Sequence, residues 1–276
     1  MAGRYNRVYY PESYPEIFSI WEQYPSAVLF AGGTALLREQ GSQTLELPEI
    51  ILSLDRMDDM HRISRSERFL EIGAMVKLSQ IIDLGKTVPA ILRSCLENIA
   101  GLQLRNMATI GGNICYSGRR LDSAAALTAL DAQYELRTSQ SSRWISASRF
   151  SAMPGFSAIG HQEILSRIRI PLETWDYSAY KKFAGQASMS KVAAFLVRTQ
   201  KNILSDIRVV YKSDLIWRDK DSESLLIGKH LPLSRRIAAE FVASWDAFIS
   251  NVGNIGELSH TELTNFIEQN INNLSE

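Results

Sequence analysis

Two glycine pairs set the strongest constraint on how this chain folds and on what it binds. The first lies in FAGGTALL at residues 30–37, and the second in MATIGGNIC at residues 107–115. Each pair stands beside a threonine and between apolar runs, where the missing Cβ lets the backbone approach another group closely. A strand that leads into Gly-Gly-Thr offers consecutive N–H groups to phosphate oxygens. The alternative is a turn from a strand into a helix that needs glycine for its shape alone.

An acid, Asp122, follows the second glycine pair. Acids accept hydrogen bonds from ribose hydroxyls in other dinucleotide-binding folds, and Asp122 suits that role. It also opens an apolar segment of helical character at residues 123–130, where it would serve as an N-cap. Neither glycine segment matches the P-loop or the GxGxxG fingerprint. The two loops and the acid together predict a site for a pyrophosphate-bridged nucleotide.

Composition excludes several other classes of protein. Thirty basic residues balance thirty acidic ones over 276 residues, so a nucleic-acid partner is not expected. No apolar run approaches the roughly 20 residues that span a bilayer, and residues 1–16 lack the apolar core of a secretory signal. We therefore expect no membrane partner and a cytoplasmic location. Two cysteines and four scattered histidines predict neither an iron–sulfur cluster nor another metal site in this chain.

Strands and helices are mixed without a regular βαβ alternation, which predicts the α+β class. Strands are expected at residues 7–10, 26–30, 49–54, 69–74, 134–138, 142–145, 163–171, 193–197 and 207–211. Helices are expected at residues 14–23, 35–40, 78–84, 90–99, 123–130, 233–249 and 261–271. The composition changes near residues 171–176, which places a domain boundary there.

Residues 98–138 closely resemble the FAD-binding domain of the molybdenum hydroxylases, a family that includes the flavin subunits of xanthine, carbon monoxide and nicotine dehydrogenases. Its members typically carry RNxATIGGN followed by DSxPALLALDA, with AGGTDLL upstream, and both segments occur here in that order. EILSRIRIP at residues 163–171 and SAYKK at 178–182 resemble a third FAD-contacting region. LLIGKHLPLS at 225–234 resembles the start of the family's C-terminal domain. The resemblance implies a two-lobed PCMH-type FAD-binding domain over residues 1–175 and a small α/β C-terminal domain over 176–276.

The resemblance also implies FAD as the cofactor and assigns its contacts. The first loop would wrap the pyrophosphate with Leu29, Phe30, Ala31, Gly32, Gly33, Thr34, Ala35 and Leu36. The second loop would contact phosphate and ribitol with Thr109, Gly111, Gly112 and Asn113. Asp122 would meet the adenosine ribose, and Ile99 falls where the family often carries an aromatic side chain near the ring system. Leu165 and Lys181 match two further contacts, although the match of Lys181 requires a one-residue deletion and an ordinary solvated lysine is the alternative.

The chain departs from the family pattern close to these contacts. Ala35 replaces the usual aspartate, and Gly118-Arg119 replaces the usual Ser-Pro. Tyr116 stands where a small or hydroxylic residue is common, and the GQAS stretch at residues 185–188 lacks an arginine often found there. Arg119 and Arg120 either offer charge to phosphates or form a solvated pair. Cys115 is expected to be a small buried hydrophobe, with a reactive thiol as the alternative.

By this resemblance, the chain is an electron-transfer subunit of a molybdopterin-dependent hydroxylase or dehydrogenase. Its partners would be an iron–sulfur ([2Fe–2S]) subunit and a molybdopterin-binding large subunit, with NAD or another molecule as the electron acceptor. No acid–base pair is identified, so no catalytic residue is predicted. Two alternatives stay open: a stand-alone FAD-dependent reductase, and a non-catalytic relative that acts in assembly or scaffolding.

Overall fold

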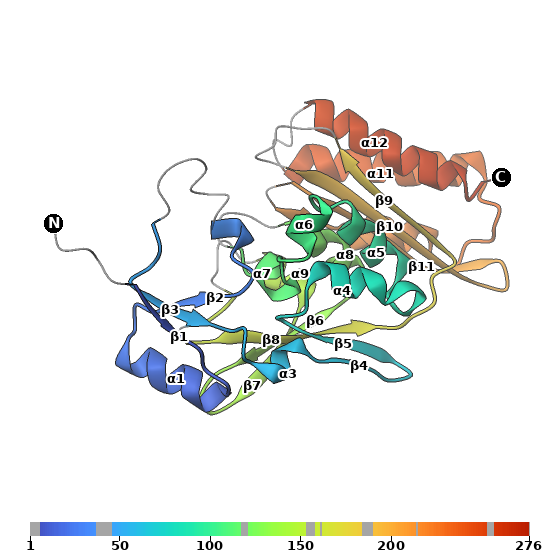
Figure 1. Cartoon of the computed structure of the whole chain (residues 1–276). Helices are drawn as coiled ribbons and strands as arrows, with labels where there is room; N and C mark the ends of the chain where they lie inside the picture. The colour runs from blue at the N-terminus through green and yellow to red at the C-terminus, as the bar shows by residue number, and fades with distance from the viewer. Residues whose placement is uncertain are drawn as a thin grey trace. The chain divides into compact units, whose positions relative to one another are not determined.

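The computed structural model describes residues 6–36, 46–116, 121–152, 158–160, 162–183, 190–213, 215–252 and 257–275. They form two compact units, and the chain passes between them more than once (Figure 1). Unit 1 comprises Met1–Val88, Ile99–Arg119 and Ala132–Leu172. Unit 2 comprises Pro89–Asn98, Arg120–Asp131 and Glu173–Glu276. The mixture of helices and strands confirms the α+β class, while the boundary between residues 175 and 176 stays a prediction.

A small parallel sheet in unit 1 carries the first glycine loop. Its strands run in the order β1-β3-β2, with β1 at Arg7–Tyr9, β3 at Ile50–Ser53 and β2 at Val28–Phe30. The central strand β3 is buried along its whole length, and α1 (Tyr14–Gln23) buries Ile17 and Phe18. The glycine loop leaves the carboxyl end of β2, which is the end of a parallel strand where ligands commonly bind.

The second sheet of unit 1 has five antiparallel strands in the order β4-β5-β8-β6-β7. These strands are β4 (Ile63–Arg65), β5 (Phe69–Gly73), β8 (Ile164–Pro171), β6 (Gln133–Arg137) and β7 (Ser142–Ser146). The central strand β8 buries Ile164, Ile168 and Ile170, as the alternation of its sequence predicts. Five short helices accompany the sheet: α3 (Asp58–His61), α4 (Leu78–Asp83), α6 (Leu102–Arg105), α7 (Ile110–Ile114) and α9 (Ala147–Ala152). Of these, α3 packs on β5, α7 on β8 and α9 on β7.

Unit 2 is built on a four-stranded antiparallel sheet in the order β12-β11-β10-β9. The strands are β9 (Tyr177–Phe183), β10 (Lys191–Gln200), β11 (Ile203–Lys212) and β12 (Ile216–Trp217). The helices are α5 (Ala90–Glu97), α8 (Ser123–Ala129), α10 (Lys220–Leu226), α11 (Arg235–Val252) and α12 (Glu257–Asn272).

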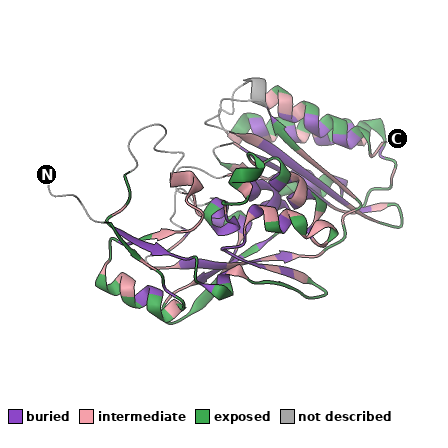
Figure 2. Ribbon diagram, viewed as in Figure 1, coloured by how far each residue is buried: buried purple, intermediate pink, exposed green. Residues whose placement is uncertain are grey.

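Helices cover both faces of this sheet. On one face α11 and α12 bury an aromatic core that includes Phe183, Phe195, Tyr211, Trp245 and Phe266. On the other face α8 packs against β10 and β11, and α5 against β9 (Figure 1). Residues 192–197 of β10 are therefore buried without interruption, whereas α11 and α12 turn exposed residues outward (Figure 2). This burial on both sides makes β10 recognisable from the sequence as a continuous apolar run.

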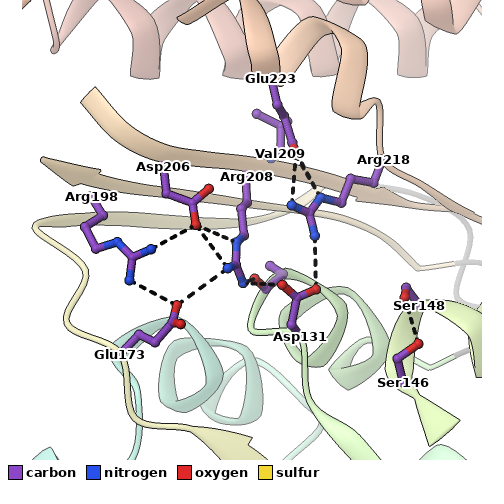
Figure 3. A network of polar contacts seen from close by, with 11 residues as sticks. Asp131, Ser146, Ser148, Glu173, Arg198, Asp206, Arg208, Val209, Arg218 and Glu223 are labelled. Carbon is purple, nitrogen blue, oxygen red and sulfur yellow. Dashed lines mark hydrogen bonds and ion pairs between the residues drawn. The ribbon is translucent and has the colours of Figure 1, made fainter. Parts of the chain in front are cut away.

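The buried Arg208 of β11 connects the end of one chain segment of unit 2 to the start of the next (Figure 3). Its guanidinium contacts the carboxylates of Asp206 at 3.0 Å, Asp131 at 2.9 Å and Glu173 at 3.5 Å. It also donates to the carbonyl oxygen of Ala129 at 2.8 Å. Asp131 is the last residue of one segment of unit 2 and Glu173 the first of the next. Arg208 therefore fixes both segment ends to the sheet.

Two more arginines extend this network. Arg198 contacts Glu173 at 3.3 Å and Asp206 at 3.4 Å, and the guanidinium groups of Arg198 and Arg208 lie 5.3 and 4.6 Å from the ring centroid of Trp175. Arg218 contacts Asp131 at 3.2 Å and Glu223 at 3.0 Å. Burial raises the pKa of Glu223, and Arg218 opposes that rise.

The predicted strands and helices occur within a few residues of their expected limits, and the structure contains further elements. The helix expected at residues 35–40 begins with helical backbone at residues 34–36, and its remainder lies outside the described residues. The elements that were not predicted are strands β4, β9 and β12 and helices α3, α6, α9 and α10. The second glycine segment is the short helix α7. Among the described residues, no helix combines the length and apolarity needed to cross a bilayer.

Candidate functional site: two glycine loops and the Asp122 cluster

The first glycine loop presents unused backbone donors. The chain leaves β2 at Phe30, and the N–H of Leu54 donates to its carbonyl oxygen at 3.0 Å, which ties the loop to β3. Gly33 has a φ of +69°, in the left-handed region that favours glycine. Within the described residues, the N–H groups of Ala31, Gly32 and Gly33 donate no hydrogen bond. These donors are therefore available to an anionic ligand.

Gly32 has a different role from the one expected for a phosphate loop. A Cβ on Gly32 would lie 2.1 Å from the carbonyl oxygen of Met107 and 3.1 Å from the Cα of Ala108. The first loop thus packs on the backbone that leads into the second loop, and the structure places the two glycine segments side by side. At Gly32 the missing Cβ makes room for protein backbone, not for a ligand.

The second glycine segment is capped and hydrogen-bonded from within. Thr109 is the N-cap of α7, and its hydroxyl oxygen accepts a hydrogen bond from the N–H of Gly112 at 3.0 Å. The N–H of Gly111 donates to the Ala74 carbonyl at 2.8 Å, and the N–H of Asn113 donates to the Thr109 carbonyl at 2.9 Å. The backbone donors of this segment are thus used inside the protein. Of the predicted contacts in this segment, Gly112 is exposed, whereas Thr109 and Asn113 are buried at 1% and 7% exposure.

The other predicted contacts of unit 1 lie around these loops. Leu29, Ala35 and Leu36 are half-buried, in β2 and in the helical turn after Gly33. Ile99 is half-buried, and its carbonyl oxygen accepts a hydrogen bond from Arg105 at 3.0 Å. Leu165 is buried in β8, opposite Leu136 of β6. Tyr116 is half-buried, while Gly118, Arg119, Arg120 and the GQAS stretch lie outside the described residues.

Asp122 does not cap α8. Its backbone is already helical, with φ −60° and ψ −34°, and its side chain makes no capping hydrogen bond. The N-cap interpretation is therefore wrong. The carboxylate is 7% exposed, accepts a hydrogen bond from the Ser190 hydroxyl, and lies 2.9 Å from the Nζ of Lys182 and 3.8 Å from the Nζ of Lys212.

The register of the sheet explains why both lysines reach Asp122. Lys182 of β9 and Lys212 of β11 are both paired with Val192 of β10, so the three side chains form one row on the face that α8 covers. Lys181 is paired with Ala193 and lies on the opposite face of the sheet, where its Nζ is 5.5 Å from the ring centroid of Phe183. Matching of the sequence to the family pattern selected Lys181 and not its neighbour Lys182. The alternation of residues along β9 distinguishes the two lysines, but this strand was not predicted.

Cys95 of α5 is buried in the same region of unit 2. Burial raises the pKa of its thiol to about 12, and the charge of Asp122 acts in the same direction. Burial also raises the pKa of the Tyr180 hydroxyl. Both groups stay protonated near neutral pH, so neither is an ionic nucleophile there. Cys115 is half-buried at the end of α7. No three His, Cys, Asp or Glu residues of the described ranges are placed to hold a metal ion.

Comparison with known proteins identifies similar chains. A family model described as the FAD binding domain in molybdopterin dehydrogenase matches residues 3–173. The glyceraldehyde dehydrogenase medium chain of Sulfolobus acidocaldarius is 28% identical over 227 residues, which cover 80% of each chain. The xanthine dehydrogenase FAD-binding subunit of Escherichia coli O157:H7 is 30% identical over 171 residues, 60% of this chain and 58% of that one. The structure of quinoline 2-oxidoreductase from Pseudomonas putida 86 shares the fold, with a TM-score of 0.82 at 20% identity over 98% of this chain and 96% of that one.

Proposed function

Since this chain belongs to the family of FAD-binding domains of molybdopterin dehydrogenases and has FAD as its cofactor, we propose that it is the electron-transfer subunit of a molybdopterin-dependent hydroxylase or dehydrogenase. Its proposed partners are an iron–sulfur subunit and a molybdopterin-binding large subunit. The proposed acceptor is NAD or another oxidant, and the proposed location is the cytoplasm. The medium-chain and FAD-subunit relatives support this assignment, as does the absence of any predicted acid–base pair.

The first glycine loop is the observation that carries the proposal. The unused N–H groups of Ala31, Gly32 and Gly33 lie at the carboxyl end of a parallel strand, which fits the diphosphate of a dinucleotide. When bound, FAD supplies hydride and single-electron chemistry, and the protein supplies binding, orientation and electrostatics. The residues of this loop fit that division of roles, because they offer hydrogen-bond donors and no titratable group.

We propose the following roles for the predicted contacts. The N–H groups of the first loop hold the pyrophosphate, and Thr109, Gly112 and Asn113 contact phosphate and ribitol. Asp122 accepts a hydrogen bond from a hydroxyl of the adenosine ribose. We also propose Lys182, beside the predicted Lys181, as a positively charged contact of the ligand, because Lys182 lies in one cluster with Asp122. Gly111, Ile99 and Leu165 complete the proposed set, and residues 1–175 and 176–276 remain the proposed domains.

The purified chain is expected to carry FAD in a ratio close to one per protein. The visible flavin absorbance band, measured with the FAD released on denaturation, tests this. Protein that is colourless and takes up no added FAD would support a non-catalytic relative instead. Isolation of the tagged chain from its native cell separates the two flavoprotein hypotheses: a subunit brings along iron and molybdopterin, while a stand-alone reductase brings neither.

Asp122→Asn is expected to weaken FAD binding by about 1–3 kcal/mol, because it removes the charge from an acceptor of ribose hydroxyls while it keeps the side-chain shape. The dissociation constant from flavin fluorescence is the measurement. Asp246→Asn is the matched control, since that carboxylate is 51% exposed and pairs with His260 on another part of unit 2. A lower melting temperature with unchanged FAD affinity in Asp122→Asn would contradict the ribose role.

A further inference from the structure

A lysine that is fully buried, Lys212, ends β11 beneath the start of α8. The residue is 0% exposed, and a buried ammonium group is costly unless polar atoms surround it. Its Nζ donates to the carbonyl oxygen of Ser190 at 2.6 Å and lies 3.4 Å from the hydroxyl oxygen of the same residue. An oxygen of the Asp122 carboxylate lies 3.8 Å from the same Nζ. Lys212 therefore reaches Asp122 mainly through Ser190.

Sheet geometry fixes the order of these groups. Ser190 stands two residues before Val192, the residue that lies between Lys182 and Lys212 in the row across the sheet. Residues two apart in an extended chain face the same side, which directs Ser190 toward α8. The Ser190 hydroxyl donates to one oxygen of Asp122, and Lys182 contacts the other at 2.9 Å. Lys182 also donates to the carbonyl oxygen of Asn98 at 3.2 Å, which anchors it in turn.

The Asp122 carboxylate is thus held at both oxygens, and its plane is fixed. A carboxylate has about four lone-pair positions, so these contacts leave acceptor capacity for a further donor. We propose that Lys212 is a positioning residue for FAD: it holds Ser190, and Ser190 orients Asp122 toward a ribose hydroxyl. This inference rests on the proposed function, in which Asp122 is the ribose contact. Lys212 itself touches no ligand in this arrangement.

The test compares FAD with an FAD analogue whose adenosine ribose lacks both hydroxyl groups, each bound to the purified full chain. Lys212→Met keeps an unbranched side chain, one atom shorter than lysine, and removes the charge. We expect it to weaken FAD binding about tenfold, the effect of one well-placed hydrogen bond. Binding of the analogue should change little, so the preference for FAD over the analogue should fall by a similar factor. A purely structural lysine would weaken both ligands equally.

Ser190→Ala provides a second route to the same group, and it keeps the carbonyl oxygen to which Lys212 donates at 2.6 Å. It should reproduce the loss of preference, and the double variant should lose little more than either single variant, because both act through one carboxylate. Lys220→Met on the exposed surface of α10 is the matched control and should leave both affinities unchanged. If the wild-type chain binds FAD and both variants keep its preference for FAD over the analogue, the inference is overturned and the proposed function stands. A wild-type chain that binds no FAD would overturn the proposed function.

Discussion

Gly32→Ala should abolish FAD retention and lower the free energy of unfolding by about 3 kcal/mol. The added Cβ would lie 2.1 Å from the Met107 carbonyl oxygen, and neither partner is a flexible side chain. Overpacking a well-packed site costs about 1–3 kcal/mol, and a backbone-to-backbone clash belongs at the upper end of that range. The loops must separate to relieve it, so the unused N–H groups of residues 31–33 lose their positions. Urea denaturation and flavin absorbance measure the two effects.

Gly101→Ala is the matched control for this substitution. Gly101 precedes the same second loop, has an ordinary φ of −88°, and its Cβ would meet only the side-chain oxygen of Gln103 at 3.4 Å. We expect this variant to retain FAD and to unfold within about 0.5 kcal/mol of the wild type, as substitutions away from packed features do. Similar losses in Gly32→Ala and Gly101→Ala would show that the contact between the loops is not what retains the flavin.

Local sequence predicted most of the elements because their apolar spacing is regular. β8 alternates, β10 contains a continuous apolar run, and α11 buries a side chain at each helical turn. β9 escaped prediction because one of its faces carries Ser178, Tyr180 and Lys182, which reads as polar surface. That face is covered through a contact with Asp122, sixty positions earlier in the chain. No local pattern encodes such a partner.

The candidate site, too, was only partly predictable from the sequence. Glycine, threonine and their spacing identified the two loops, since a missing Cβ is visible in the sequence itself. What each glycine accommodates was not visible: Gly32 accommodates the Met107 backbone, and Gly111 would place a Cβ 2.6 Å from that of Ala74. Asp122 was identified as an acid at the start of a helix, yet its partners come from strand ends in the last third of the chain. Long-range pairing decided those roles.

Arg208→Met is expected to lower the free energy of unfolding by about 2 kcal/mol. The substitution removes a buried cation that Asp131, Glu173 and Asp206 share, and a hydrogen bond to a charged group contributes about 1.5–3 kcal/mol. The loss stays within that range because Arg198 and Arg218 still contact the three carboxylates, of which Asp131 and Glu173 are 48% and 39% exposed. Urea denaturation, followed by circular dichroism, provides the measurement.

Arg198→Met is the control that separates burial from charge. Arg198 contacts Glu173, Asp206 and the Trp175 ring as Arg208 does, but its side chain is 35% exposed, so its loss should cost about 1 kcal/mol or less. Equal losses in the two variants would show that burial of Arg208 adds nothing to stability.

The position of Arg208 also bears on FAD binding. It holds the carboxyl end of α8 at Ala129 and Asp131, while Asp122 at the other end meets Lys182 and Lys212. Release of α8 at Arg208 should therefore weaken FAD binding as well, and Arg198→Met should not.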